Sequence, residues 1–558
     1  MIKDPLHFFQ NHQIDPRAEQ VDVLNTVKAN WNKYKYFCIS APPGVGKTYI
    51  ATAIADAAAS AYVLTSTHML QEQYEESWSE LVNLKGRGNY TCALNSNFTV
   101  DAAPCNIKKE LVKSCKTNCT CPYYNRRKEA MESKSMITNP PFMLYSTHCG
   151  FAKEGSSEWN KREVLLIDEA HHLESHLVSF AESDIDIERL EKLYGLDLSD
   201  VKFYDGNNTH NYQAALTLKN KLQAKYDGYQ GVINREYSKT KVSSADLGQW
   251  AQSFTAMHGE IVADVTKKSN AIDKVLQPLN MFFGSSQADV DKNWILSKTF
   301  GKNALKISPL YASFLFEKHL GKLADKFVFM SATLGTKSAF CKELGIPESD
   351  CLYIDCDSPF PAELSPIVIM PLIKLSKDVY DVNIKKLGPI IDTILDEHKG
   401  QRGIIHAVTY DIQKQIFDRV RSSNQRRLTC RDMVPYRPGH KQPNNGQLLE
   451  AHMAKSDSIL VSPSMMTGVD LKDDLSAFQI IVKMPWGNLG DARIKRKQTI
   501  DSDWYANNCW RNLIQACGRS TRHDKDTSVT YVLDANFNFF YSKWERNLPG
   551  HFIKRLTS

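Results

Sequence analysis

The sequence predicts an α/β protein with two lobes, each built on a parallel sheet, and with two insertions in the first lobe. Short apolar runs that end in polar or Gly-containing loops fall into two groups, one before about residue 360 and one after it. Such short, bounded runs are typical of buried parallel strands. The first group is interrupted by a cysteine-rich segment and by a long stretch with helical spacing, which we interpret as insertions.

Length and composition limit the kind of protein. The chain has 558 residues, more than one compact core uses, so we expect three to five domains. A hydrophobic fraction of 42% and a charged fraction of 24% indicate a folded chain rather than a disordered one. The net charge of +6 permits a polyanionic partner, but a solvated surface gives the same balance. An odd number of cysteines, 13, and an amino terminus without a signal-like apolar core favour a cytoplasmic protein with no membrane segment.

The expected strands of the first lobe end where ligands normally bind. In open α/β sheets, ligands lie beyond the carboxyl ends of the strands. The four runs are Tyr36–Ser40, Ala61–Thr65, Val164–Ile167 and Phe327–Met330.

The loop after the first of these strands has the composition of a phosphate-binding loop. Residues 41–48 read APPGVGKT and precede a helix rich in Ala and Ile. Gly44 and Gly46 let backbone N–H groups close around phosphate, Lys47 would reach the β and γ phosphates of ATP, and the Thr48 hydroxyl would bind Mg²⁺. The usual first glycine is an alanine here, so a chance Gly-rich turn is the alternative. The strand before the loop and the helix after it favour the nucleotide site.

Asp168 and Glu169 end the third strand of this group. Asp168 is placed to hold Mg²⁺ through water, and Glu169 to orient and deprotonate the attacking water.

A zinc hydrolase built on nearby histidines is the competing interpretation of this region. Its candidate ligands would be His171, His172, Glu174 and His176. His172 and His176 have helical i,i+4 spacing, but no Glu follows His172 directly as a zincin requires. Histidines on a helix surface are the more ordinary interpretation.

After the third strand, the short apolar runs typical of strands give way to helical spacing and later return. Residues 185–310 contain segments with helical spacing, Ile187–Tyr194 and Asp246–Asn280, and predict a mostly helical insertion. The strand pattern resumes in a second lobe, with runs at Gly403–Tyr410, Ser458–Ser462, Phe478–Met484 and Val529–Leu533.

A basic motif, QACGRSTR, lies near the end of the second lobe. It begins at Gln515 and places Arg519 and Arg522 three residues apart, on one face of a predicted helix. Guanidinium groups that reach the γ-phosphate stabilise charge in the transition state. A basic helix face is the default interpretation of such a pair, and its position after the other two motifs favours the catalytic one.

Taken in order, these motifs resemble those of superfamily 2 helicases. The two insertions narrow the match to the iron–sulfur helicases typified by XPD and DinG, and the short chain is similar to compact phage or bacterial DinG-like forms. The resemblance covers nearly the whole chain. Its motifs are PRAEQ at Pro16–Gln20, APPGVGKT, TST at Thr65–Thr67, DEAH at Asp168–His171, SAT at Ser331–Thr333, the segment Ser462–Leu471, and QACGRSTR.

The resemblance implies two RecA-like parallel-sheet lobes with an iron–sulfur insertion and a mostly helical arch insertion in the first lobe. Residues 1–85, 126–184 and 311–360 would form the first lobe, 86–125 the iron–sulfur domain, 185–310 the arch and 361–558 the second lobe. It also implies an ATP-dependent DNA helicase that moves 5′→3′ on single-stranded DNA and opens DNA forks with an iron–sulfur wedge. We expect a monomer in the cytoplasm of a bacterium or of a phage-infected host.

The resemblance also assigns roles to individual residues. Arg17 and Gln20 would contact the nucleotide base region, and Ser331 and Thr333 would couple hydrolysis to movement. Gly468 and Asp470 would link the ATP site to DNA. Thr467, where many members have an acidic residue, is a departure from the pattern. The expected catalytic set is Lys47, Asp168, Glu169, Gln515, Arg519 and Arg522.

Five cysteines between residues 92 and 121 supply one more thiolate than a [4Fe–4S] cluster needs. We expect Cys92, Cys105, Cys115 and Cys121 to be the ligands, with Cys119 as a substitute for Cys115. Four thiolates also suit tetrahedral Zn²⁺, although the paired C-x₂-C knuckles of a zinc ribbon are missing.

Two basic segments are candidates for contact with DNA. Single-strand channels combine Lys and Arg with aromatic side chains on which bases stack. For the run Arg493–Lys497, a solvated helix face is an interpretation as good as contact with DNA. Around the cysteines the candidates are Lys108, Lys109, Lys113, Lys116, Tyr123, Tyr124, Arg126, Arg127 and Lys128.

Two other functions compete with that of a DNA helicase. One is a translocase or RNA-directed motor that does not separate DNA strands, and the other is a nucleotide-switched binding module.

Overall fold

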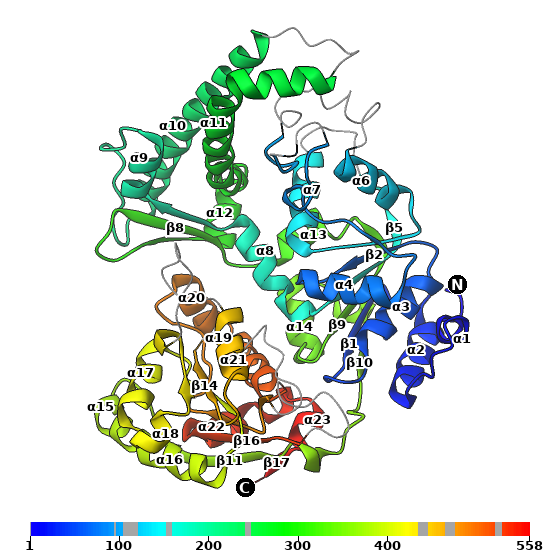
Figure 1. Ribbon diagram of the computed structural model, residues 1–558, viewed down its shortest axis with the longest axis vertical. Helices are drawn as coiled ribbons and strands as arrows, with labels where there is room; N and C mark the ends of the chain where they lie inside the picture. Colours follow the sequence, from blue (N-terminus) through cyan, green and yellow to red (C-terminus); the bar gives the residue numbers. More distant parts are fainter. Residues whose placement is uncertain are drawn as a thin grey trace. The chain divides into compact units, whose positions relative to one another are not determined.

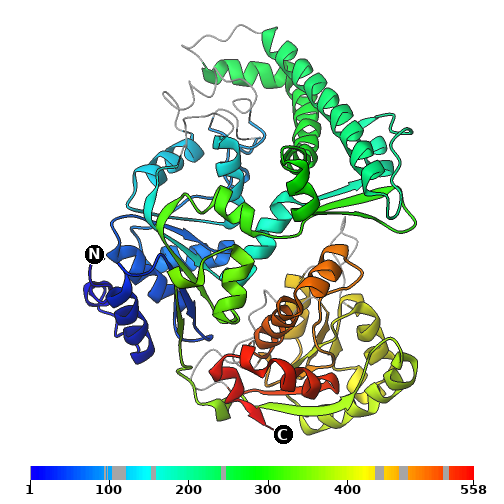
Figure 2. The same cartoon turned by 180° about the vertical axis from the view of Figure 1, so that it is seen from behind.

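The computed structural model describes residues 2–93, 96, 98–103, 121–151, 159–239, 247–433, 445–463, 475–518 and 527–557 (Figures 1 and 2). The chain divides into two compact units. Unit 1 comprises Met1–Phe8, Ala51–Val328 and Lys342–Pro347, and unit 2 comprises Phe9–Ile50, Phe329–Cys341 and Glu348–Ser558. Within the described part of the chain, no helix combines the length and the apolar character that a bilayer span requires.

The first sheet has seven strands in the order β10-β1-β9-β5-β2-β4-β3. The pairings of β1 with β10, of β2 with β4 and β5, and of β3 with β4 are parallel. The strands β1, β2 and β4 are buried along their whole length, and the first two read as mainly apolar runs. The strands are β1 (Tyr36–Ser40), β2 (Ala61–Leu64), β3 (Val82–Asn83), β4 (Ser135–Thr138), β5 (Arg162–Asp168), β9 (Ala324–Ser331) and β10 (Cys351–Asp355).

All four strands expected in this region are therefore present, β5 and β9 being longer than predicted. The strands β3, β4 and β10 were not named from the sequence. The helices around this sheet are α1 (His7–Asn11), α2 (Ala18–Asn30), α3 (Lys47–Ala57), α4 (His68–Ser77), α6 (Pro122–Glu132), α7 (Pro140–Phe151), α8 (Leu173–Ala181), α13 (Ser313–His319) and α14 (Lys337–Leu344).

The insertion after α8 is mostly helical, as expected, but it rests on a small antiparallel sheet. Two long helices, α10 and α11, lie side by side (Figures 1 and 2). The sheet has the order β6-β8-β7, and none of its strands, SDID, ALKISP and WILSK, is a continuous apolar run. The elements are β6 (Ser183–Asp186), α9 (Ile187–Tyr194), α10 (Asn208–Ser238), α11 (Leu247–Phe283), α12 (Gln287–Asn293), β7 (Trp294–Lys298) and β8 (Ala304–Pro309).

The second large sheet is parallel throughout, with seven strands in the order β13-β14-β12-β15-β16-β11-β17. The strands are β11 (Ile367–Ile373), β12 (Gly403–His406), β13 (Leu428–Thr429), β14 (Ile459–Ser462), β15 (Phe478–Ile481), β16 (Val529–Asp534) and β17 (Leu556–Thr557). The helices of this region are α15 (Tyr380–Asn383), α16 (Leu387–Glu397), α17 (Tyr410–Arg419), α18 (Ser422–Gln425), α19 (Asn445–Met453), α20 (Ala492–Ile500), α21 (Ser502–Cys517), α22 (Asn536–Trp544) and α23 (Gly550–Ile553).

The strand expected over 403–410 stops at His406. Val408 has a φ of 65°, in the left-handed region, which no strand residue adopts. Thr409 then caps α17, because its side chain accepts a hydrogen bond of 3.1 Å from the Ile412 N–H. The polar end of the predicted run is therefore a turn and a helix start, and the prediction was wrong there.

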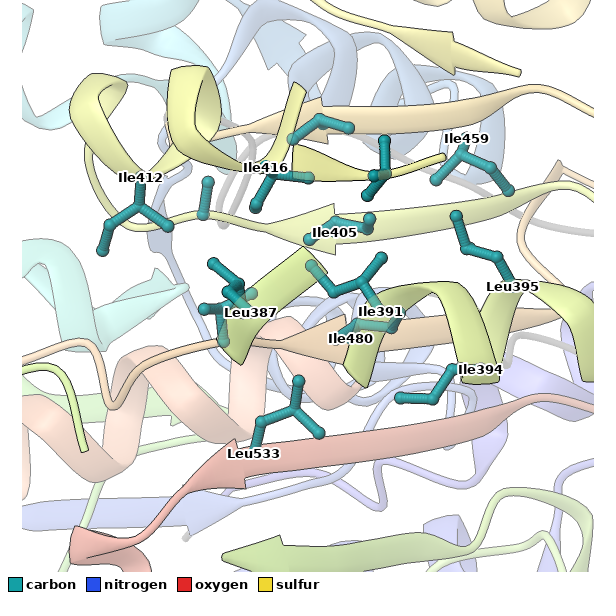
Figure 3. Packing of buried hydrophobic residues seen from close by; sticks show 14 of the residues in the cluster. Leu387, Ile391, Ile394, Leu395, Ile405, Ile412, Ile416, Ile459, Ile480 and Leu533 are labelled. Atoms are coloured by element: carbon teal, nitrogen blue, oxygen red, sulfur yellow. The ribbon is translucent and has the colours of Figure 1, made fainter. Parts of the chain in front are cut away.

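Helix α16 supplies much of the core above this sheet (Figure 3). Leu387, Ile391 and Leu395 recur at helical spacing and are fully buried. They pack against Ile405 and Ile480 of two neighbouring strands. A β-branched strand surface facing one apolar helix stripe is the usual solution for an α/β layer.

Replacing Ile391 with Ala should cost about 2–5 kcal/mol of local stability, because the removed side chain leaves a cavity between α16 and the sheet. Ile390→Ala, one residue earlier and only partly buried, is the matched control and should cost clearly less. Hydrogen exchange of the full chain, read in peptides that cover β12 and β15, measures both. Equal loss of protection in the two variants would contradict this packing.

Candidate functional site

The phosphate-loop candidate lies between β1 and α3. Gly44 and Gly46 have φ values of 84° and 85°, a conformation that residues with a Cβ rarely adopt. A Cβ on Gly44 would overlap the ring of Phe360, and one on Gly46 would lie 2.5 Å from the Gln20 amide nitrogen. Both glycines are thus required by conformation and by space. Helix α3 begins at Lys47, as the sequence predicts for a loop that ends at a helix N-terminus.

Residues at the start of α2 brace this loop by donating hydrogen bonds to its backbone carbonyl groups. Arg17 donates a hydrogen bond from Nη1 to the Gly44 carbonyl oxygen. Gln20 donates from Nε2 to the Val45 carbonyl oxygen at 2.9 Å, while its Oε1 accepts from the Arg17 N–H at 2.9 Å. The PRAEQ residues, expected near the nucleotide base, therefore hold the loop itself.

The loop is also tied to the end of β9. The Ala41 N–H donates to the Ser331 carbonyl oxygen at 2.9 Å, and Lys47 Nζ lies 3.5 Å from the Ala41 carbonyl oxygen. Ala41, which replaces the usual glycine, is completely buried. Thr48 is nearly buried at the start of α3.

Helix α21 contacts the SAT segment within unit 2. Gln515 Nε2 lies 3.5 Å from Thr333 Oγ1, and Arg511 Nη2 donates to the Leu334 carbonyl oxygen at 2.7 Å. The Thr333 N–H in turn donates to Ser331 Oγ at 3.0 Å. Sequence reasoning named Gln515 but missed Arg511, although the i,i+4 spacing puts both on one helix face.

A cavity of about 470 Å³ borders the phosphate loop within unit 2. Pro42 and Pro43 line it, as do Phe360, Gly518 and His551. The Arg17 guanidinium lies 5.9 Å from the centre of the Phe360 ring. Phe360 and His551 were not named from the sequence, because neither lies in a motif.

His551 lines this cavity as a neutral imidazole. Burial lowers its pKa to about 4, with smaller effects from the charges of Arg555 and Lys47. Neither ring nitrogen has a hydrogen-bond partner among the described residues. A neutral ring with both nitrogens unsatisfied can donate to a ligand at one nitrogen and accept from it at the other.

The Asp168 carboxylate is oriented by two hydrogen bonds within unit 1. Its Oδ2 accepts from the Tyr74 hydroxyl at 3.0 Å, and its Oδ1 accepts from the Glu169 N–H at 2.8 Å. Glu169 has a left-handed φ of 51°, a strained conformation that is common at functional sites. Its Oε2 lies 3.3 Å from His171 Nδ1. Tyr74, on α4, was missed because it lies outside every motif.

The histidines after Glu169 are packed against one another rather than spread on a helix surface. The His171 side chain is only 4% exposed, and its ring centre lies 3.8 Å from that of His172. Burial lowers the pKa of His176 to about 4, so that this ring stays neutral. The helix-surface interpretation was therefore wrong for His171. In the described ranges, no three His, Cys, Asp or Glu side chains are grouped to hold a metal, so the zinc hydrolase gains no support.

Two of the four expected cluster ligands lie within the described residues. Cys92 and Cys121 are both buried and both free of disulfides. Their flanking residues meet, since the Tyr90 and Tyr123 rings are in edge contact at 5.6 Å and Arg87 lies over Tyr123. Cys105 and Cys115, and the substitute Cys119, lie outside the described residues.

The aromatic residues expected to stack on DNA near the cysteines are buried instead. Tyr123 packs on Tyr90, and the Arg127 guanidinium lies 5.8 Å from the Trp159 ring centre. Arg126 pairs with acidic residues on α4 and α6. Lys128 is the exposed member of this group that the structure describes. Lys108, Lys109, Lys113 and Lys116 lie outside the described residues, and so do Thr467, Gly468, Asp470, Arg519 and Arg522.

The basic run on α20 is divided between packing and solvent. Arg493 and Lys497 place their charges 5.4 and 4.8 Å from the Trp504 ring centre. Lys495 and Arg496 remain exposed. Half of the predicted patch is therefore structural.

A buried strand, a loop with two left-handed glycines and a helix that starts at Lys-Thr define the chain as a P-loop protein. Comparison with known proteins gives the particular class. Residues 13–199 match the family model of the type III restriction enzyme res subunit, and residues 392–554 match that of the helicase C-terminal domain.

The relatives and the solved structures point the same way. The chain is 22% identical over 503 residues to the ATP-dependent DNA helicase CHL1 of Kluyveromyces lactis and 21% identical over 530 residues to that of Schizosaccharomyces pombe. These alignments cover 78% and 81% of this chain, but only 59% and 61% of the relatives. An XPD helicase structure matches with a TM-score of 0.65, at 14% identity and over 98% of this chain and 100% of the other. The Xpd4 structure from S. tokodaii matches with a TM-score of 0.55, at 13% identity, over 97% and 100%.

These findings confirm the predicted resemblance. The chain has the α/β fold of the XPD structures and matches the res-subunit and helicase C-terminal family models over two separate regions.

Gly44→Ala should weaken ATP binding by about tenfold or more, because the new Cβ meets the Phe360 ring and forces the loop out of its left-handed conformation. Gly195→Ala is the matched control, since Gly195 also has a positive φ but no atom near the added Cβ. The control should lose roughly 1–2 kcal/mol of local stability and keep its ATP affinity. Titration with a fluorescent ATP analogue distinguishes the two. Unchanged affinity in Gly44→Ala would contradict the phosphate-loop assignment.

Proposed function

We propose that this protein is an ATP-dependent DNA helicase of the XPD/DinG type. The observation that carries the proposal is the glycine loop, braced by Arg17 and Gln20 and tied to the SAT segment that α21 contacts. Relatives that share its domains are named ATP-dependent DNA helicases, which supports DNA as the substrate.

The nucleotide would be MgATP. Gly44 and Gly46 would shape the phosphate cradle, Lys47 would pair with the β and γ phosphates, and Thr48 and Asp168 would hold Mg²⁺. Glu169 would activate the attacking water. The two hydrogen bonds that orient the Asp168 carboxylate and the left-handed backbone of Glu169 support these roles.

The arginines of QACGRSTR would complete the site. Arg519 and Arg522 would stabilise charge on the γ-phosphate in the transition state, and Asp470 would link the nucleotide to the DNA path. Gln515 would report the nucleotide state to the SAT segment through Thr333. Movement would be 5′→3′ along single-stranded DNA, by resemblance to the family.

A [4Fe–4S] cluster fits the described part of the cysteine segment. Cys92 and Cys121 are buried and form no disulfide, and the contact between the nearby Tyr90 and Tyr123 rings supports placing both cysteines at one cluster. With Cys105 and Cys115 they would hold the cluster, which would supply the fold of a domain over residues 86–125 that is too small to fold alone. That domain would separate the strands of a fork, next to an arch over residues 185–310. Zn²⁺ on the same ligands is the outcome that would exclude the iron–sulfur assignment.

Lys47→Ala should abolish ATP hydrolysis while the protein stays folded and still binds single strands, because Lys47 is proposed to act on the phosphates alone. Lys33→Ala, a surface lysine with the same loss of charge, should hydrolyse ATP normally. DNA-stimulated phosphate release is the measurement, combined with strand displacement on 5′-tailed and 3′-tailed forks. Normal turnover in Lys47→Ala would exclude this ATP site. ATP turnover without displacement in the wild type would point to a translocase, and turnover that DNA does not stimulate would point to a nucleotide switch.

Cys92→Ser should lose iron and fork unwinding but keep DNA-independent ATP hydrolysis, because the cluster is proposed to shape the wedge and not the ATP site. Cys430→Ser, at a buried cysteine far along the chain, should keep its iron. Metal analysis of anaerobically purified protein should find iron at one [4Fe–4S] cluster per chain in the wild type and in the control. Normal unwinding by Cys92→Ser would refute the wedge.

A further inference from the structure

The loop of the β7–β8 hairpin presents one phenylalanine entirely to solvent. Phe300 is 100% exposed, the highest value among the large apolar side chains of the described residues. It lies in the connection between Lys298 and Ala304. The hairpin that contains this connection is at the edge of the helical insertion (Figures 1 and 2). A fully exposed ring at a loop tip contributes nothing to the packing of its own chain.

The tip is held rigidly. The Thr299 N–H donates to the Ala304 carbonyl oxygen at 2.9 Å, and Gly301 takes the left-handed φ of 72° that closes the turn. Asn303 then fixes the loop to the segment before α10, accepting from the Phe203 N–H at 3.0 Å and donating to the Val201 carbonyl oxygen at 2.8 Å. The exposed ring is therefore presented on a pre-organised support, which lowers the entropy cost of binding.

The charge around the ring is positive. The segment 293–316 carries Lys298, Lys302 and Lys306 but no Asp or Glu. Lys306 pairs with Glu182 at 3.2 Å, whereas Lys298 and Lys302, on either side of Phe300, form no ion pair with described residues. The hairpin tip thus combines one exposed ring with two available ammonium groups.

The segment that Asn303 fixes adds a second aromatic residue and a third lysine. Lys202 is exposed, and its carbonyl oxygen accepts from His210 Nε2 at 2.9 Å. Tyr204 is 48% exposed, and its ring packs edge-on against His210 at 4.7 Å. The strand β6 places two acidic residues beside the hairpin. Asp186 caps α9 through the Arg189 N–H, and Asp184 lies opposite Lys306 rather than at the tip.

We propose that this surface, formed by Phe300, Tyr204, Lys298, Lys302 and Lys202, binds single-stranded nucleic acid, with a base stacked on Phe300 and phosphates at the lysines. Exposed rings interleaved with unpaired cations are the combination that binds single strands without sequence preference. An apolar protein surface would contact the ring but leave the lysines without a counter-charge, which favours a polyanion as the partner. The inference rests on the proposed function only in that the motor supplies the strand.

The test is fluorescence anisotropy of a labelled oligothymidylate with the full chain. Phe300→Ala and Phe300→Leu should each raise the Kd by about tenfold, because both remove stacking, while Phe300→Tyr should keep the wild-type affinity. The matched control is Phe539→Ala, which removes an exposed ring (68%) from α22 and should bind normally. Hydrolysis of ATP without DNA should be unchanged in all four variants.

The lysines have their own signature. Lys298→Gln with Lys302→Gln should reduce the slope of log Kd against log salt by about 1.4, since each phosphate contact contributes about 0.7 for a single strand. Wild-type affinity in Phe300→Ala, or an unchanged salt slope, would overturn the inference, and a normal Phe300→Leu would point to an apolar protein contact instead. Wild-type protein that fails to bind the oligonucleotide at all would refute the proposed function rather than this surface.

Discussion

The backbone of three residues, Gly44 to Gly46, sets the constraint on which the rest of the site depends. A loop that closes around phosphate must turn its N–H groups inward, and this requires φ values that side chains oppose. Its carbonyl groups then point outward and need donors. Arg17 and Gln20 supply those donors from α2, and the Ala41 N–H binds the end of β9. The PRAEQ segment thus acts first as a brace, because an unbraced loop of this conformation would relax.

The sequence was most informative where burial and chemistry coincide. The eight apolar runs each became a strand, since a strand covered on both faces leaves no ambiguity of period. The phosphate loop followed from its glycines. The strand predicted over Gly403–Tyr410 extended too far, because the chain turns at Val408 and Thr409 caps the next helix. The antiparallel sheet β6-β8-β7 gave no signal, since polar residues or proline interrupt each of its strands.

Two of the residues that sequence reasoning missed act on a motif residue, or on the residue next to a motif, from elsewhere in the chain. Tyr74 orients Asp168 across 94 positions, and Arg511 holds the Leu334 carbonyl across 177. Such pairs are fixed by tertiary packing, which motif spacing does not encode. The error at Tyr123 has the same origin. An aromatic residue beside basic ones suggests a stacking platform, but Tyr90 meets this ring and removes it from solvent. Exposure, not composition, separates such a ring from Phe300.

The two contacts of α21 with the SAT segment differ in strength, and the difference has a mechanical consequence. Arg511 makes a charged hydrogen bond of 2.7 Å to a backbone carbonyl, and this fixes the helix. Gln515, one turn later, reaches Thr333 at 3.5 Å, the limit of a hydrogen bond. Both residues lie on one face of the helix, so the longer contact can change while the shorter one is kept. Gln515 also lies four residues before Arg519, one of the two arginines that we propose act on the γ-phosphate. We therefore propose that the longer contact, rather than the shorter one, changes with the nucleotide state.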